Sequence, residues 1–166
     1  MIREVTGDLV KSDAHLICHQ TNFHGVMGGG VALSIWNELL TDTSKMLYQE
    51  HCADRGRDLL GTVHFVRATR RSDGHDSIVA NLFCQDDQLQ ADGGLTRYDC
   101  MRKCLQVVEV IAREQGLPTV AMPGYMGCGI AGGEWGKVYA IIREVFEDSP
   151  VELTIVYWEK HGGYQG

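Results

Sequence analysis

The sequence lacks the features that mark several specialised classes of protein. No apolar run approaches the roughly 20 residues of a membrane-spanning helix, and the N-terminus, MIREVTGDLV, has charges and a glycine where a signal peptide would need an apolar stretch. Internal repeats, low-complexity segments and long linkers are absent. The 166 residues therefore suit one domain, and we expect an intracellular, cytoplasmic protein.

Positive charge is also scarce. Lys and Arg number 15 against 22 Asp and Glu, which gives a net charge of −7. Non-specific binding to nucleic acid requires a basic footprint, so we do not expect it. A single anionic ligand is still compatible with this charge, because backbone N–H groups can hold a phosphate without a positive side chain.

The cysteines lack the spacing of a metal site. No CxxC pair occurs among the six, which are Cys18, Cys52, Cys84, Cys100, Cys104 and Cys128. Cys100 and Cys104 share a face of a predicted helix, but zinc would need two more ligands, and Cys18 with His19 is the best remaining pair. We expect reduced, mostly buried thiols and no metal, because a chain of this size can hold a core without disulfides or a bound metal ion.

Short apolar runs alternate with helical patterns, which is typical of an α/β fold. Strands are predicted at residues 2–5, 15–19, 62–67, 77–83, 119–122 and 151–158. Helices are predicted at residues 31–40, 43–55, 96–115 and 135–146. A turn at residues 72–74 makes the third and fourth strands an antiparallel hairpin. These elements indicate a mixed sheet covered by helices on both faces, with ligands bound at the carboxyl ends of the strands.

Two glycine-rich stretches occupy equivalent places in this pattern. Residues 25–30, GVMGGG, and residues 124–133, GYMGCGIAGG, each follow a buried strand and lead into a helix. In that geometry backbone N–H groups and a helix N-terminus converge on an anion. We interpret the pair as two loops that grip a diphosphate from both sides, in preference to two structural turns.

Two other phosphate-binding patterns fit less well. A P-loop needs Ser or Thr after Gly-Lys, but Val138 follows Gly136 and Lys137. The dinucleotide pattern GxGxxG occurs at residues 127–132, between a strand and a helix. Only one βαβ unit follows it, whereas a dinucleotide-binding half normally opens the fold, so a Rossmann oxidoreductase is the less favoured alternative.

Taken together, the motifs resemble those of a macro domain, the α/β/α module that binds ADP-ribose. They keep the family's order: GDL at residues 7–9, Asn22 before MGGGVA at 27–32, PGYMGCGI at 123–130, and VY at 156–157. The resemblance is to the branch that contains terminal ADP-ribose protein glycohydrolase, the DarG macro domain and the yeast ADP-ribose 1″-phosphate phosphatase. It implies a three-layer α/β/α sandwich with a mixed central sheet, formed by one domain at residues 1–160 and followed by a flexible tail at 161–166.

The resemblance also implies the ligand contacts. Asp8 would accept a hydrogen bond from the adenine amino group beside the Leu9 backbone, with capping of a turn as the alternative role. Tyr157 would stack on adenine, with core packing as the alternative, while Trp158 would face the other way. Asn22 would contact the distal ribose. The phosphate loops would comprise Gly28, Gly29, Gly30 and Val31 on one side, and Gly127, Cys128, Gly129, Ile130 and Ala131 on the other.

The catalytic residues of the lysine-dependent relatives have no counterpart here. Their lysine would fall at Cys84 or Gln85, and their aspartate would fall at Ala131. A lysine adduct with the opened ribose is therefore not available by this route. Catalysis by Cys84 would need a lowered thiol pKa, and we expect a buried strand-end thiol instead.

Other polar residues are expected near the distal ribose, namely Asn22, His24, Gln85, Asp86, Asp87 and Tyr98. A histidine with a neighbouring acid can activate water or protonate a leaving group, so we nominate Asn22, His24 and Asp87 as catalytic. The alternatives are a loop histidine that makes only a backbone contact and, for at least one of the two aspartates, a solvated charge.

Two functions follow from these expectations. The favoured one is a hydrolase that uses an activated water to remove a group from the distal ribose: phosphate from ADP-ribose 1″-phosphate, acyl from O-acetyl-ADP-ribose, or ADP-ribose from an ester. The alternative is a reader that binds ADP-ribose without chemistry. Both require no cofactor, and we expect a monomer that does not bind membranes and whose partner is ADP-ribose or an ADP-ribosylated substrate.

Overall fold

The computed structural model describes residues 1–158, in which six strands form one mixed sheet. The strands are β1 (Ile2–Gly7), β2 (Leu16–Thr21), β3 (Val63–Thr69), β4 (Asp76–Phe83), β5 (Thr119–Pro123) and β6 (Glu152–Trp158). Their order across the sheet is β1-β6-β5-β2-β4-β3. All neighbours pair in parallel except β3 and β4, so the predicted antiparallel hairpin is confirmed. The predicted tail at 161–166 and the last two residues of the predicted domain lie outside the described residues.

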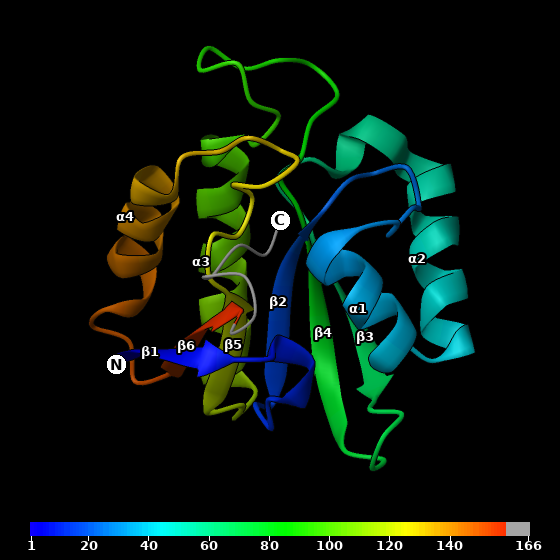
Figure 1. The fold of residues 1–166 in the computed structure, drawn as a ribbon, viewed down its shortest axis with the longest axis vertical. Coiled ribbons are helices and arrows are strands. Elements are labelled where there is room, and N and C mark those ends of the chain that lie inside the picture. The colour runs from blue at the N-terminus through cyan, green and yellow to red at the C-terminus, as the bar shows by residue number, and fades with distance from the viewer. Residues whose placement is uncertain (159–166) are drawn as a thin grey trace.

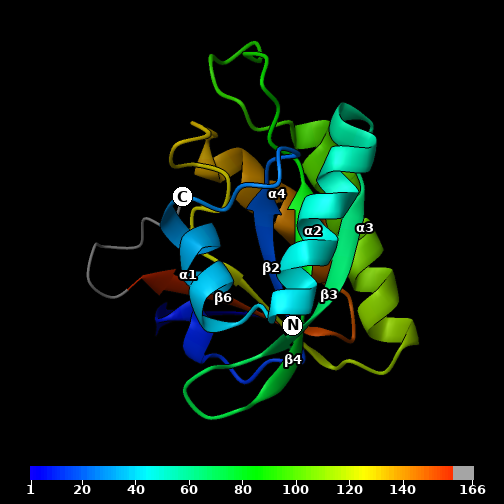
Figure 2. The same cartoon turned by 90° about the vertical axis from the view of Figure 1, so that its right-hand side faces the viewer.

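Helices cover both faces of the sheet (Figures 1 and 2). The helices α1 (Gly30–Glu38) and α2 (Asp42–Arg55) contribute to one hydrophobic cluster, and α3 (Tyr98–Glu114) and α4 (Trp135–Phe146) contribute to another. Successive side chains of β2 alternate between the two, since Leu16 packs in the α3/α4 cluster and Ile17 in the α1/α2 cluster. This three-layer arrangement confirms the predicted α/β/α fold class.

The element boundaries follow the predictions with small differences. The helix at Trp135–Phe146 has the predicted limits. The predicted helix at 96–115 begins only at Tyr98, because Arg97 N donates to Cys84 O at 2.8 Å and Thr96 pairs with Gln85 in an isolated bridge. The two short 3₁₀ helices η1 (Leu9–Lys11) and η2 (Gly56–Leu59) were not predicted, since a three- or four-residue turn leaves no periodic pattern in a sequence.

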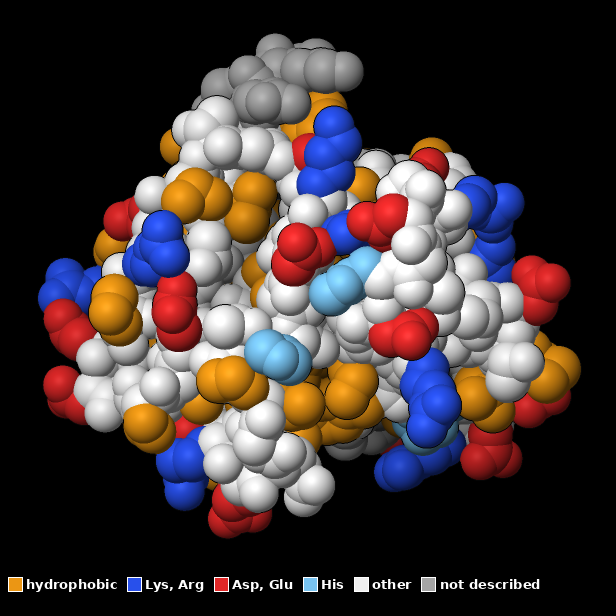
Figure 3. Space-filling model, turned by 90° about the horizontal axis from the view of Figure 1, so that it is seen from below, with side chains coloured by type: hydrophobic (Ala, Val, Ile, Leu, Met, Phe, Trp, Pro, Cys, Tyr) orange, Lys and Arg blue, Asp and Glu red, His pale blue; other side chains and the backbone are white. Residues whose placement is uncertain are grey.

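The loops after β2, β4 and β5 all leave from the carboxyl ends of their strands, at the top of Figure 1, because these strands are parallel. The opposite end, viewed in Figure 3, mixes acidic, basic and histidine side chains over its surface. At the end where β2 and β4 begin, the nearly buried Arg70 donates to carboxylates of Asp13 and Asp73 at 2.7 Å each and ties the two strand entries together. This ion-pair cluster therefore lies at the end of the sheet opposite the loops that form the candidate site.

Residues 1–158 contain neither a membrane-spanning helix nor a cluster of metal-ligating side chains. None of the helices described there has the length and apolar character needed to cross a bilayer. No group of three or more His, Cys, Asp or Glu side chains in this part of the chain is arranged to hold a metal ion. The cysteines are free and five of the six are buried, as predicted.

Candidate functional site

The two glycine-rich loops form opposing walls of one cavity of about 180 Å³. The first loop contributes Gly28, Gly29, Gly30 and Val31, and the second contributes Gly127 and Ile130. A Cβ added to Gly29 would lie 3.8 Å from Cδ1 of Ile130, so the walls approach to contact distance. The structure thus brings together the two loops that the sequence analysis paired. Cys128, Gly129 and Ala131 are not among the described residues that line the cavity.

The first wall ends in the N-terminus of α1. Gly30 has φ 57°, in the left-handed region that favours glycine. No hydrogen bond among residues 1–158 uses the N–H groups of Gly29, Gly30 or Val31. The first N–H bonded back along the helix is that of Leu33, which donates to Gly29 O at 3.2 Å. Free N–H groups at the positive end of a helix dipole favour an anion at this wall.

Asn22 braces the first loop from inside. Its Oδ1 accepts from the N–H of His24 at 2.9 Å, and its Nδ2 donates to Val26 O at 2.9 Å. The hydroxyl of the buried Tyr48 donates to Asn22 O at 3.0 Å. Asn22 also lines the cavity, and one hydrogen of its Nδ2 is left over for a ligand.

The second wall is shaped by close packing around glycine. A Cβ on Gly124 would lie 2.2 Å from Cδ1 of Tyr157, and one on Gly127 would lie 2.9 Å from Oε1 of Gln20. Gly127 also has φ 75°. Among residues 1–158, no hydrogen bond uses the N–H groups of Gly129 or Ile130. This wall therefore also presents free main-chain donors, held in place by a backbone that only glycine permits.

Asp8 and Leu9, predicted to hold adenine, are not among the described residues that line this cavity. Asp8 is the N-cap of η1, where its carboxylate accepts from Val10 N at 3.3 Å. Leu9 is buried in the α1/α2 cluster. The alternative role of Asp8 as a turn cap is thus observed, and its contact with adenine stays a prediction.

Tyr157 also lies outside the cavity lining in the described part of the chain. It packs against the α3/α4 cluster, its hydroxyl donates to Oε1 of Glu4 at 2.7 Å, and its ring meets Trp135 edge-on. Trp158 follows it as the last residue of β6, and its predicted position on the other face of the strand stays a prediction. The stacking of Tyr157 on adenine likewise stays a prediction.

Sequence reasoning missed much of the cavity lining. Gln85, which was expected near the distal ribose, lines the cavity. The additional residues are His19, Gln20, Thr21, Val26, Met27, Ala32, Pro123 and Met126. Among residues 1–158, no Lys, Arg, Asp or Glu belongs to this lining, so within this part of the chain an anion would be held by main-chain N–H groups. Position is a signal that could have found four of them, since His19, Gln20, Thr21 and Pro123 stand at or near the end of a strand, where α/β folds bind ligands.

Among the described residues that line the cavity, His19 has the one ionisable side chain, since no Tyr or Cys belongs to this set either. It is 1% exposed, and its Nε2 lies 2.7 Å from Oδ1 of Asn81. Burial lowers the pKa of His19 to about 4 even though the Asn81 hydrogen bond opposes that shift, so the ring is neutral at pH 7. Sequence analysis had weighed His19 only as a neighbour for zinc.

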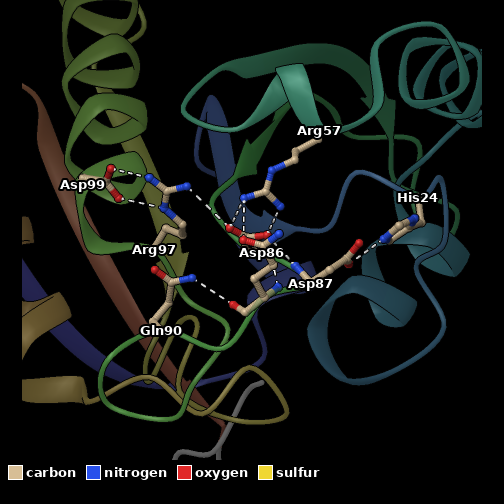
Figure 4. A network of polar contacts seen from close by, with 8 residues as sticks. His24, Arg57, Asp86, Asp87, Gln90, Arg97 and Asp99 are labelled. Carbon is tan, nitrogen blue, oxygen red and sulfur yellow. Dashed lines mark hydrogen bonds and ion pairs between the residues drawn. The ribbon is translucent and has the colours of Figure 1, made fainter.

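His24 and Asp87 meet at the rim, beside the cavity (Figure 4). Nε2 of His24 lies 2.7 Å from Oδ1 of Asp87, and the two side chains are 53% and 55% exposed. Neither residue lines the cavity, but Val26 lines both the cavity and the neighbouring depression that contains His24. The nominated pair thus exists in the structure, while its catalytic role stays a prediction.

Asp86 has a different environment from Asp87. Its side chain is 1% exposed and receives two hydrogen bonds from the Arg57 guanidinium, one of them from Nη2 at 2.9 Å. Burial raises the pKa of the Asp86 carboxyl, but the hydrogen bonds from Arg57 and from the N–H groups of Gln88 and Asp87 outweigh it, so the pKa lies below its usual value. Of the two aspartates, therefore, Asp87 is the solvated one.

Cys84 and Ala131, at positions of the missing catalytic residues, offer no reactive group to the cavity. Cys84 is fully buried, and burial together with its contact to Cys104 raises its pKa far above the usual value, so the sulfur stays a thiol. Ala131 is buried as well. Tyr98 is engaged, since its hydroxyl donates to Asp92 Oδ2 at 2.7 Å and accepts from Glu134 N at 2.9 Å. The expected buried thiol at Cys84 is confirmed.

Comparison with known proteins finds similar sequences and similar solved structures. No family model matches the chain. A DNA ADP-ribosyl glycohydrolase of Mycobacterium tuberculosis is 29% identical over 160 residues, which cover 95% of this chain but only 42% of the relative's length. The macrodomain of Thermus aquaticus DarG superposes with a TM-score of 0.73 at 23% identity, covering 95% of this chain and 97% of the other.

A Thermosipho africanus DarTG structure in complex with ADP-ribose superposes with a TM-score of 0.70 at 18% identity, over 90% of this chain and 39% of the other. The shared fold therefore extends over nearly the whole of this chain and over part of longer relatives. The chain therefore has the macrodomain fold.

Proposed function

We propose that this chain binds ADP-ribose between its two glycine-rich loops and hydrolyses an attachment at the distal ribose. The observation that carries the proposal is the cavity with free main-chain N–H groups on both walls and no charged Lys, Arg, Asp or Glu in its described lining. Such an arrangement suits a diphosphate, which needs many donors and no carboxylate nearby. The names of the relatives, a DNA ADP-ribosyl glycohydrolase and a DarTG complex with ADP-ribose, support the same ligand and reaction class.

The rim supplies groups that can activate water. With Asp87 Oδ1 as the acceptor, Nε2 of His24 carries the proton, and Nδ1 is free to take a proton from water. The resulting hydroxide attacks the anomeric carbon of the distal ribose as its bond to the leaving oxygen breaks, and the proton on His24 then passes to that oxygen. The pair is about half exposed, so a bulky group attached to the ribose has room to extend into solvent.

A reader that only binds ADP-ribose is the second candidate, and one observation favours it. Within the described residues, the cavity is lined by a single ionisable side chain, His19, whose lowered pKa of about 4 makes it a weak base. The positions that hold lysine and aspartate in the lysine-dependent relatives carry Gln85 or Cys84 and Ala131. The pair at the rim is thus the feature on which hydrolysis depends.

Two measurements test the proposal. Calorimetry with ADP-ribose should show saturable binding, and a panel of ADP-ribosylated DNA, an ADP-ribosyl ester, O-acetyl-ADP-ribose and ADP-ribose 1″-phosphate should show turnover of at least one substrate. His24→Ala should lose turnover and keep binding, whereas Asn22→Ala should weaken both because Asn22 braces the loop. His15→Ala, at the entry to β2 away from the cavity, is the matched control. Binding without turnover would favour the reader, and absence of binding would refute both functions.

A further inference from the structure

We infer that Asp86 is a positioning residue, whose buried carboxylate fixes the backbone of Asp87 so that the Asp87 side chain meets His24. The catalytic consequence of this inference rests on the proposed function, but the geometric part does not. Sequence analysis placed Asp86 among polar residues near the ribose without a role, and the structure shows that its carboxylate is directed into the protein interior.

The carboxylate of Asp86 collects donors from three elements (Figure 4). Arg57, from η2, reaches both of its oxygens. Arg97, at the start of α3, lies 3.5 Å from Oδ2 and is itself held by Asp99 at 2.7 Å. The third set is the backbone that follows β4, where Oδ1 of Asp86 accepts from Asp87 N at 2.7 Å and Gln88 N at 3.2 Å.

This arrangement fixes the direction of Asp87. The N–H of Asp87 is bonded inward to Asp86, and its carboxylate extends to Nε2 of His24 on the first glycine-rich loop. The main chain is fixed on the other side too, since Asp86 N donates to Leu95 O at 2.8 Å. A charged acceptor makes stronger hydrogen bonds than a neutral one, so Asp86 defines this backbone more tightly than a turn alone would.

The contact between His24 and Asp87 needs such support. Both side chains are about half exposed, and an ion pair or hydrogen bond at that exposure contributes little by itself, because solvent screens it and two mobile side chains must be ordered. Asp86, in contrast, is buried, paired with Arg57 and Arg97, and linked to rigid elements. The geometry of the exposed pair is therefore set by the buried residue next to it.

Asp86→Asn tests the inference, with Asp92→Asn as the matched control. Asp92 lies on the far half of the same segment, where its carboxylate accepts from Gly94 N at 2.9 Å and from the Tyr98 hydroxyl at 2.7 Å, and none of its hydrogen bonds involves Asp86, Asp87 or His24. The first readout is the pair of ring nitrogen-15 NMR signals of His24, which report the contact with Asp87 whether or not the protein is an enzyme. The second is the split between kcat and KM on the substrate that the wild type turns over.

We expect Asp86→Asn to shift the His24 ring nitrogen-15 signals in the same direction as Asp87→Asn does, and Asp92→Asn to leave them as in the wild type. We expect kcat to fall roughly 10- to 100-fold with KM changed less than about twofold, because misplacing a reacting group costs rate more than binding. Arg57→Lys keeps the charge but cannot form the planar bidentate pair with the Asp86 carboxylate, so it should give an intermediate loss. It is the variant to measure if Asp86→Asn does not fold.

An unchanged His24 signal in folded Asp86→Asn, or equal losses in Asp86→Asn and Asp92→Asn, would overturn the inference. If the wild type turns over no substrate, hydrolysis fails as a function, but the His24 signal still decides whether Asp86 positions Asp87. The two failures are thus separable.

Discussion

The two walls of the cavity contain glycine for different reasons. In the first loop, a Cβ on Gly28 or Gly29 would find its nearest neighbours at 3.5 and 3.8 Å, which are ordinary contacts. In the second wall, a Cβ on Gly124 would lie 2.2 Å from the Tyr157 ring, and one on Gly133 would lie 2.6 Å from Gly127 O. The fold itself demands glycine in the second wall. The fold does not demand Gly28 or Gly29, so a ligand that approaches the backbone is the physical reason we assign to them.

The walls also differ in how they are held. The first loop depends on the Asn22 side chain, which bonds to the backbone on both sides of its turn. The second is held by its own main chain, since Gly133 N donates to Gly127 O and Gly132 N to Gly129 O, both at 2.9 Å. Substitutions at Gly28 and Gly29 should therefore act on binding, and those at Gly124 and Gly133 should act on stability.

The largest effect is expected from Gly124→Ala. Because the Tyr157 ring is held by its hydrogen bond to Glu4 and by the neighbouring aromatic rings, the added methyl cannot be accommodated without a shift. Overpacking of this kind costs about 2–3 kcal/mol. Urea unfolding followed by circular dichroism measures the loss. A midpoint equal to that of the wild type would mean that the second wall tolerates side chains and that the contrast between the walls is false.

An effect of intermediate size is expected from Gly29→Ala. Its φ of −158° suits any residue, so stability should change by less than about 0.5 kcal/mol. ADP-ribose affinity should fall about 10-fold, close to 1.4 kcal/mol, because the methyl stands between the first loop and Ile130. Gly136→Ala in α4, where an added Cβ meets nothing within 4 Å, is the control and should not change binding. Calorimetry and thermal melting together give both quantities, and a stability loss without a binding loss in Gly29→Ala would reverse the assignment.

The smallest expected effect is a pH dependence in residues 86–95, the segment that links the two walls. Asp87 joins this segment to the first loop through His24, and Leu95 N joins it to the second through Ala131 O at 2.6 Å. The folded-state pKa of Asp86 is lowered, so its contribution to stability is present above the unfolded value of about 4 and is lost as the pH falls through the lower, folded value.

Hydrogen exchange checks this pH dependence. As the pH falls through the lowered, folded-state pKa of Asp86, and after correction for intrinsic rates, the N–H groups of Asp87 and Gln88 should lose protection because their acceptor becomes protonated, whereas that of Leu95, bonded to a carbonyl, should not. In Asp86→Asn this difference between acid and neutral pH should disappear. Equal loss at Leu95 would show that the segment opens as one unit.

Much of the fold could be predicted from local patterns. The helix at Trp135–Phe146 has a strong apolar periodicity and was predicted with its observed limits. The predicted first strand stopped at Val5, two residues short of the observed end at Gly7, because Thr6 and Gly7 extend β1 only through pairing with β6. Strand ends depend on such partners, which a local pattern does not contain.

The candidate site was predicted only in part. His24 and Asp87 were nominated by residue type, and they meet although 63 residues separate them. The adjacent acids Asp86 and Asp87 look alike in sequence. The structure distinguishes them, because Asp86 is buried and paired with Arg57, which lies 29 residues earlier in the chain. His19 was missed as a cavity residue because its burial depends on helices elsewhere in the chain. Its lowered pKa has the same origin.

By itself, the sequence determined the α/β alternation, the placement of two glycine-rich loops after buried strands, and the net negative charge of −7. These properties follow from local periodicity and composition. Tertiary structure alone decided which glycines are demanded by packing, which aspartate is buried, and which side chains line the cavity. Each of those depends on the distance between atoms far apart in the chain, and that distance is set only when the sheet and its helices pack together.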